Sequence, residues 1–129
     1  MEAAAVSNKI RVLIADDHRL FAETLQALLA TEGRVEVVGS ARDGKEAVQL
    51  ARKLRPDVIL MDISMPVMDG FEATRRIRLD REDACVLILT GSNARTDVDL
   101  ARKAGAAGYV TKDRIAAELI DAIVEVVNR

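Results

Sequence analysis

Aromatic residues and cysteine are scarce in this sequence. Phe, Tyr and Trp together make up 2% of the 129 residues, and Cys85 is the single cysteine. Half of the residues are apolar, so a core with so few aromatics has to be built from Ala, Val, Ile and Leu. One cysteine excludes an internal disulfide. We therefore expect sheets and helices packed through aliphatic side chains in a reducing compartment, with Cys85 on a buried strand.

An excess of charge of one sign and long apolar runs are also missing. The 19 basic and 21 acidic side chains nearly cancel, to a net charge of −2, which provides no positive field for holding DNA or an anionic membrane. No apolar run approaches the roughly 20 residues that span a bilayer. The N-terminal stretch MEAAAVSNK has neither the basic flank nor the apolar centre of a secretory signal. We expect a cytoplasmic protein with no membrane partner.

The chain is long enough for one domain and too short for two of ordinary size. Short runs rich in Val, Ile and Leu alternate along it with longer segments in which apolar residues recur every three or four positions. The runs are Ile10–Ala15, Val35–Ser40, Asp57–Asp62, Cys85–Thr90 and Ala107–Val110. The first, third and fourth are apolar almost throughout, as in parallel strands covered on both faces. The pattern predicts an α/β fold of five β-α units, a doubly wound parallel sheet with helices on both faces.

Acidic residues mark where two of the helices are expected to begin. Asp43 precedes Glu46, and Asp69 precedes Glu72, at the spacing of a capping box. The stretch GSARDGKE, residues 39–46, is also one residue short of a phosphate-binding P-loop, but Glu46 stands where Ser or Thr would bind Mg²⁺. We interpret the stretch as a turn in which Asp43 caps a helix. A nucleotide hydrolase stays a remote alternative, which a measurement of ATP binding would test.

Polar residues gather where the predicted strands end. Asp16 and Asp17 follow the first strand, Asp62 ends the third, Thr90 ends the fourth and Lys112 follows the fifth. The carboxyl ends of parallel strands share one edge of the sheet, where ligands of such folds bind, so we expect these five residues to converge. Either acid of the Asp16–Asp17 pair, taken alone, is more often a helix cap.

Three carboxylates at one edge repel one another unless a cation lies among them. Mg²⁺, or Mn²⁺, meets that need, because it binds one or two carboxylates and completes its shell with water and a phosphate oxygen. Lys112 would then act as a point charge on the phosphate, and Thr90 would donate a hydroxyl hydrogen bond to it. A carboxylate beside a metal ion and a lysine is also a nucleophile able to form an aspartyl phosphate.

This order of Asp-Asp, Asp, Thr and Lys over five β-α units resembles the receiver domain of two-component response regulators, the CheY-like family. The resemblance implies a flavodoxin-like (βα)₅ sheet with strand order 2-1-3-4-5, a tail at residues 1–8 and a receiver domain at residues 9–129. It also implies a role for each polar residue. Asp62 would be the phosphoacceptor, Asp17 a metal ligand, Asp16 its outer partner, Ser64 a ligand through its backbone carbonyl, and Thr90 and Tyr109 the switch residues.

The same resemblance implies that a phosphohistidine on a sensor histidine kinase donates the phosphoryl group. The domain itself would catalyse the transfer and the later dephosphorylation, and would not be an enzyme in the usual sense. DDH at residues 16–18 and GAAGYVTKD at residues 105–113 are similar to receivers of the NarL/FixJ type. Full-length members of that type usually carry a LuxR-type helix-turn-helix output domain.

We expect no output domain in this chain, because it ends at Arg129, where the fifth helix is expected to end. Transcriptional regulation through DNA would then need a further C-terminal domain, and homodimerisation on phosphorylation stays open. One alternative is a stand-alone phosphorelay or protein-interaction receiver without DNA-binding output. A remote one is a haloacid dehalogenase-type phosphatase, which also uses Asp, Thr and Lys but requires a second acid where Ser64 stands. Multiple turnover of p-nitrophenyl phosphate would identify the phosphatase.

Other polar residues receive structural interpretations. His18 is expected in the first turn of a helix, near the site but not as a ligand. Arg75, Arg76, Arg78 and Arg81 are expected on a solvated helix face and not at DNA. Asp113 stands where many receivers have Pro after the lysine, which leaves the geometry of the Lys112–Asp113 peptide open.

Overall fold

A computed structural model of the chain describes residues 8–91 and 95–128, so most of the expected tail, residues 1–7, lies outside the described residues. Five strands form one sheet in the order β2-β1-β3-β4-β5, and every neighbouring pair is parallel. The strands are β1 (Ile10–Ala15), β2 (Val35–Ala41), β3 (Val58–Asp62), β4 (Val86–Thr90) and β5 (Gly108–Thr111). The predicted fold and strand order are confirmed, with strand ends within one residue of those expected.

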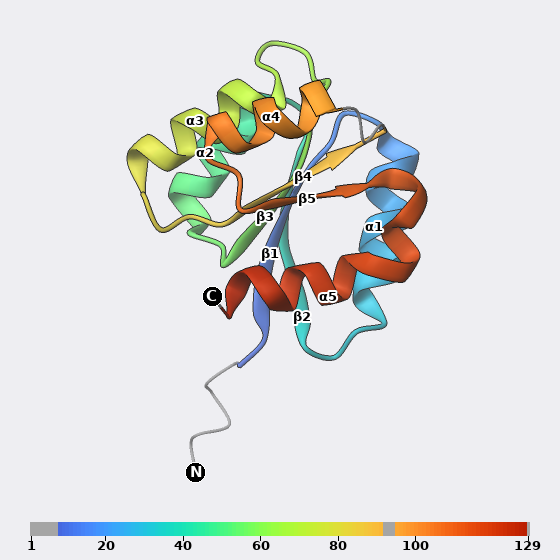
Figure 1. Ribbon diagram of the computed structural model, residues 1–129. Helices are drawn as coiled ribbons and strands as arrows, with labels where there is room; N and C mark the ends of the chain where they lie inside the picture. Colours follow the sequence, from blue (N-terminus) through green and yellow to red (C-terminus); the bar gives the residue numbers. More distant parts are fainter. Residues whose placement is uncertain (1–7, 92–94, 129) are drawn as a thin grey trace.

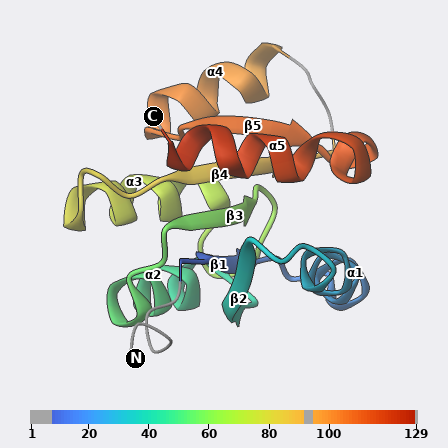
Figure 2. The same ribbon diagram turned by 90° about the horizontal axis from the view of Figure 1, so that it is seen from below.

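Helices alternate with the strands and cover both faces of the sheet, as Figures 1 and 2 show. They are α1 (Arg19–Ala30), α2 (Gly44–Leu54), α3 (Gly70–Asp80), α4 (Arg95–Ala104) and α5 (Ile115–Val127), with one 3-10 turn at Lys112–Arg114 before α5. Helices α1 and α5 lie on one face, and α2, α3 and α4 lie on the other. No helix of the described residues is long and apolar enough to cross a membrane.

Successive residues of the central strands serve two separate cores. In β3, Val58 and Leu60 pack toward α1 and α5, whereas Ile59 and Met61 pack toward α2, α3 and α4. All four side chains are at most 1% exposed. Strands buried on both faces explain the unbroken apolar runs of the sequence. Cys85 departs from the prediction, because it precedes β4 and is only half-buried.

Asp43 and Asp69 begin α2 and α3 as the sequence predicts. The Asp43 carboxylate accepts a hydrogen bond from the backbone N–H of Glu46 at 2.8 Å, and Asp69 accepts one from Glu72 at 2.9 Å. The Glu46 side chain turns back and accepts from the backbone N–H of Arg42 at 2.8 Å. Glu46 is thus part of the helix cap, which agrees with a turn and not a P-loop.

Candidate functional site

The strand register brings the predicted polar residues to the carboxyl edge of the sheet. Ala15 pairs with Met61 across β1 and β3, so the next residues along, Asp16 and Asp62, lie at the same level. Asp62 in turn pairs with Leu89, the residue before Thr90. Thr90 pairs with Thr111, which Lys112 follows directly. Pairing in three neighbouring strand pairs therefore sets the expected side chains within reach of one another.

Asp16 is the most deeply buried of the three acids. Its side chain is fully buried, and one carboxylate oxygen accepts a 2.7 Å hydrogen bond from the backbone N–H of His18. The other oxygen accepts from Lys112 Nζ at 3.4 Å. The bond from the His18 backbone to the Asp16 side chain forms the turn between β1 and α1. This turn fixes the position of the Asp16 carboxylate.

Asp17 and His18 lie at the solvent side of the same turn. The Asp17 side chain is 33% exposed, and its Oδ1 lies 3.4 Å from Nδ1 of His18. The imidazole is also 3.7 Å from Oδ1 of Asp16. His18 precedes α1 at the cap position, without a capping hydrogen bond from its side chain, where the sequence predicted a first-turn residue. Its ring thus faces the acids and does not cap the helix.

Asp62 lies buried beside Lys112 and the other two acids. It is 5% exposed, and its Oδ1 forms an ion pair with Lys112 Nζ at 3.1 Å. Burial raises the pKa of the Asp62 carboxyl above its ordinary value, Asp16 and Asp17 add to that rise, and Lys112 opposes it. One lysine therefore neutralises only part of the negative charge that the three acids bring together.

The donor set fits a hard divalent cation. Carboxylate oxygens of Asp16, Asp17 and Asp62, with a nitrogen of His18, lie within 4.8 Å of one another. Oδ2 of Asp62 is buried without a hydrogen-bond partner among the described residues, and such an atom is costly unless a donor or a cation meets it. Carboxylate oxygens are the ligands that Mg²⁺ takes.

Of the remaining predicted residues, Thr90 lies at the carboxyl edge of the sheet with the acids, whereas Tyr109 lies two residues further back, opposite Ile88. Thr90 ends β4 and is 3% exposed, Ser64 is exposed in the loop after β3, and the Tyr109 side chain on β5 is 43% exposed. Lys112 begins the 3-10 turn, and no peptide bond among the described residues is cis, so the Lys112–Asp113 peptide is trans. An open hollow of about 500 Å³ beside Lys112 is lined by His18 and by the first three residues of α1, Arg19 to Phe21.

The loop from β3 to α3 contains two features that the sequence analysis missed. A Cβ atom added to Gly70 would lie 2.1 Å from the backbone oxygen of Asp62, so α3 begins in direct contact with the end of β3. Val67 has a φ of 69°, a left-handed conformation that is strained for a β-branched residue. Pro and Gly in the stretch MPVMDG, residues 65–70, are typical of a turn, but a close approach between two backbones leaves no signal in a single sequence.

A second missed contact joins α1 to the site. The Nζ atom of Lys112 lies 4.3 Å from the centre of the Phe21 ring. In the sequence Phe21 lies in a segment with helical periodicity, and nothing in the local pattern distinguishes it. Only the packing of α1 beside the 3-10 turn after β5 could reveal this pair.

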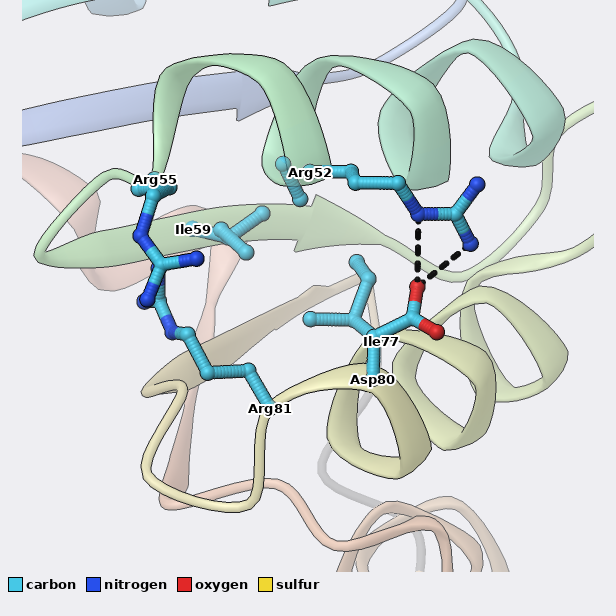
Figure 3. Close-up of a pocket in the computed structure, with 7 residues that line it drawn as sticks. Arg52, Arg55, Ile59, Ile77, Asp80 and Arg81 are labelled. Carbon is cyan, nitrogen blue, oxygen red and sulfur yellow. Dashed lines mark hydrogen bonds and ion pairs between the residues drawn. The ribbon is translucent and has the colours of Figure 1, made fainter.

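A cavity of about 60 Å³ between α2 and α3, toward the opposite edge of the sheet, is separate from these acids. Figure 3 shows the Arg52 guanidinium reaching Asp80 across it, with a closest distance of 2.6 Å. Arg81 also lines it and donates to the backbone oxygen of Pro56 at 2.8 Å. We interpret the cavity as part of the α2–α3 contact, because Arg52, Asp80 and Arg81 in its wall bond to protein partners.

The expected solvated arginine face is confirmed for only half of its members. Arg75 and Arg76 are exposed and pair with Glu72. Arg78 and Arg81 instead donate to backbone oxygens and are partly buried, so the prediction is wrong for these two. Backbone oxygens in the turns that precede β3 and β4 supply partners that the sequence does not reveal.

Comparison with known proteins identifies the family. The family model described as the response regulator receiver domain matches residues 12–124. The transcriptional regulatory protein DegU of Brevibacillus brevis is 45% identical over 90% of this chain and 49% of its own length. LiaR of Bacillus subtilis is 45% identical over 88% of this chain and 54% of its own. The chain thus spans about half the length of the curated relatives it matches.

Solved structures agree with the family match. The signal receiver domain of the putative response regulator NarL from Mycobacterium tuberculosis has a TM-score of 0.89 at 36% identity, covering 94% of this chain and 98% of that one. A LuxR-family response regulator from Aurantimonas has a TM-score of 0.89 at 37% identity, covering 93% and 86%. The parallel sheet thus has close counterparts among solved receivers, and the chain belongs to the receiver domain family of two-component response regulators, within its NarL/FixJ subfamily.

Proposed function

We propose that this receiver accepts a phosphoryl group on Asp62 from a sensor histidine kinase, with Mg²⁺ or Mn²⁺ bound at the acidic cluster. The observation that supports this most is the state of Asp62. It is a buried carboxylate with one oxygen paired to Lys112 and the other unpartnered, beside two further acids. A carboxyl group with a raised pKa and an unsatisfied oxygen is typical of a residue that takes part in a reaction.

In this proposal each residue has a defined part. Asp17, Asp62 and the backbone carbonyl of Ser64 hold the metal ion, and Asp16 supports it from outside. An oxygen of Asp62 bonds to phosphorus, the bond from phosphorus to the donor imidazole nitrogen breaks, and its electron pair stays on that nitrogen. A cation bound there would neutralise charge on the transferred oxygens. Lys112 moves from the carboxylate to a phosphoryl oxygen, and Thr90 donates a hydrogen bond to another.

Signalling would follow from a change in the populations of two conformations. Thr90 approaches the phosphoryl group, and Tyr109, which is exposed here, turns inward behind it. The phosphoryl group drives the change only if it binds one of the two conformations better. We also propose that the phosphorylated receiver forms a homodimer. The second copy would bind the surface that changes when Thr90 and Tyr109 move.

The output is proposed from the relatives. DegU and LiaR are named transcriptional regulatory proteins, and each extends well beyond the matched receiver. We propose that residues 9–129 act as the receiver of a transcriptional regulator in the cytoplasm, with DNA bound by an output domain of the LuxR type. A net charge of −2 gives the receiver itself no general attraction to DNA.

Labelling with a small phosphodonor tests the proposal. Acetyl phosphate with Mg²⁺ should add one phosphoryl group to the wild type, seen as a mass increase, and none to Asp62→Asn, which lacks the nucleophile. Lys112→Ala should keep Mg²⁺ binding in calorimetry but label more slowly, because the lysine acts on the phosphate. Equal labelling of wild type and Asp62→Asn would exclude Asp62 as the acceptor, and labelling that persists in EDTA would exclude the metal.

A further inference from the structure

The ammonium group of Lys112 has three neighbours, and one of them is a ring. Nζ lies 3.1 Å from Oδ1 of Asp62, 3.4 Å from Oδ2 of Asp16 and 4.3 Å from the centre of the Phe21 ring. The face of an aromatic ring attracts a cation within about 6 Å of its centre. The side chain of Lys112 is only 23% exposed, so water screens this attraction less than at an open surface.

Phe21 is itself held in place by the core. It is the third residue of α1, is half-buried and packs against the cluster shared by α1 and α5. A lysine side chain, by contrast, is a flexible stem that ends in an ammonium group with three donors. It loses much rotamer freedom when that group is held in one place. A ring fixed by packing therefore limits the positions that the Lys112 ammonium can adopt.

The ring differs from the Asp62 carboxylate in one respect. The attraction of Lys112 to Asp62 weakens when an oxygen of Asp62 is bonded to phosphorus, because that carboxylate then loses its charge. The attraction to Phe21 does not depend on the state of Asp62. We propose that Phe21 is a positioning residue, which keeps the Lys112 ammonium at the site for an incoming phosphoryl group. The positioning role rests on the proposed function, because it concerns phosphoryl transfer to Asp62. The contact between Phe21 and Lys112 can be tested separately.

The experiment compares three single variants. Phe21→Leu keeps apolar volume and removes the ring, and Phe21→Tyr restores the ring. Phe71→Leu is the matched control, because Phe71 is the other phenylalanine, is also half-buried, and packs against the opposite core. With saturating Mg²⁺ and acetyl phosphate, Phe21→Leu should label about 2- to 30-fold more slowly, the range that a cation–π contact predicts. Phe21→Tyr should recover most of the rate, and Phe71→Leu should show no comparable loss.

Two further measurements separate positioning from loss of packing. In a Lys112→Ala background, Phe21→Leu should have no further effect on the labelling rate, as a double-mutant cycle requires if the ring acts through the lysine. In NMR spectra without phosphodonor, the Lys112 ε-methylene protons should carry a ring-current shift that disappears in Phe21→Leu and returns in Phe21→Tyr.

The possible results are distinct. A wild type that is not labelled overturns the proposed function, while the ring-current shift still decides the contact. A labelled wild type with an equally fast Phe21→Leu variant overturns the positioning role. So does a loss that persists fully in the Lys112→Ala background, because the ring would then act on packing alone.

Discussion

The burial of Asp62 has two opposing effects on its side chain: it fixes the orientation of the carboxylate, and it disfavours the carboxylate charge. Its burial on the end of β3 gives it a single orientation, yet the same burial and the neighbouring acids disfavour its charge and raise its pKa. Lys112 offsets only part of this effect. The Asp62 carboxylate, which we propose as the phosphoacceptor, therefore destabilises the fold while it is ionised and without a cation, as is common for groups whose position serves function.

The pH dependence of folding should reveal that cost. Since the folded-state pKa of Asp62 is raised, its contribution to stability is present below its ordinary value of 3.8 and is lost as pH rises through the raised pKa. In urea unfolding with EDTA, Asp62→Asn should match the wild type at the acidic end and exceed it by about 1–3 kcal/mol near neutral pH, the usual cost of an unsatisfied buried polar group. A difference that stays constant with pH would contradict this prediction.

Two helices begin directly on the backbone around the site. A Cβ atom on Gly70 would lie 2.1 Å from the backbone oxygen of Asp62, and one on Gly44 would lie 2.1 Å from that of Met68. The backbone N–H of Gly70 also donates to the oxygen of Ile63 at 2.8 Å. The starts of α2 and α3 thus hold the loop after β3 from two sides, which keeps Asp62 in one position.

Replacing Gly70 should therefore disturb both stability and the site. Gly70→Ala forces β3 and α3 apart, and we expect a loss of about 1–3 kcal/mol in the free energy of unfolding, as for overpacked interiors. Labelling of Asp62 by acetyl phosphate should also slow, because its backbone moves. Gly33→Ala is the matched control, since nothing lies within 4 Å of a Cβ there, and it should change stability by no more than about 0.5 kcal/mol. Equal behaviour of the two variants would show that the Gly70 contact is not limiting.

The whole molecule offers one natural probe of switching. Tyr109 is the single tyrosine and there is no tryptophan, so the intrinsic fluorescence of the chain reports on this side chain. In the present conformation the residue is 43% exposed on β5, the strand next to the one that Thr90 ends. A conformational change that turns the ring inward would therefore be visible without any label.

We expect beryllofluoride with Mg²⁺ to reduce the quenching of Tyr109 fluorescence by acrylamide severalfold, because a buried ring is less accessible to the quencher. Asp62→Asn should show no change under the same conditions, because the acceptor that beryllofluoride binds is absent. Unchanged quenching in a wild type that demonstrably binds beryllofluoride would exclude Tyr109 as a switch residue. It would not contradict phosphorylation of Asp62.

The sequence alone was sufficient for the strands, the starts of α2 and α3, and the edge at which Asp16, Asp17, Asp62, Thr90 and Lys112 meet. Each of these depends on information within a few neighbouring residues, such as apolar periodicity or an acid three positions before a glutamate, together with the rule that parallel strands end at a common edge. The tertiary structure alone decided the contact of Phe21 with Lys112, the packing of Gly70 on Asp62 and the backbone partners of Arg78 and Arg81. These contacts depend on how whole helices lie against the sheet. The direct bond between Lys112 and Asp16 likewise joins residues that are 96 positions apart in the chain. A single sequence contains the local pattern of each element, whereas the distance between two elements results from the packing of all the others.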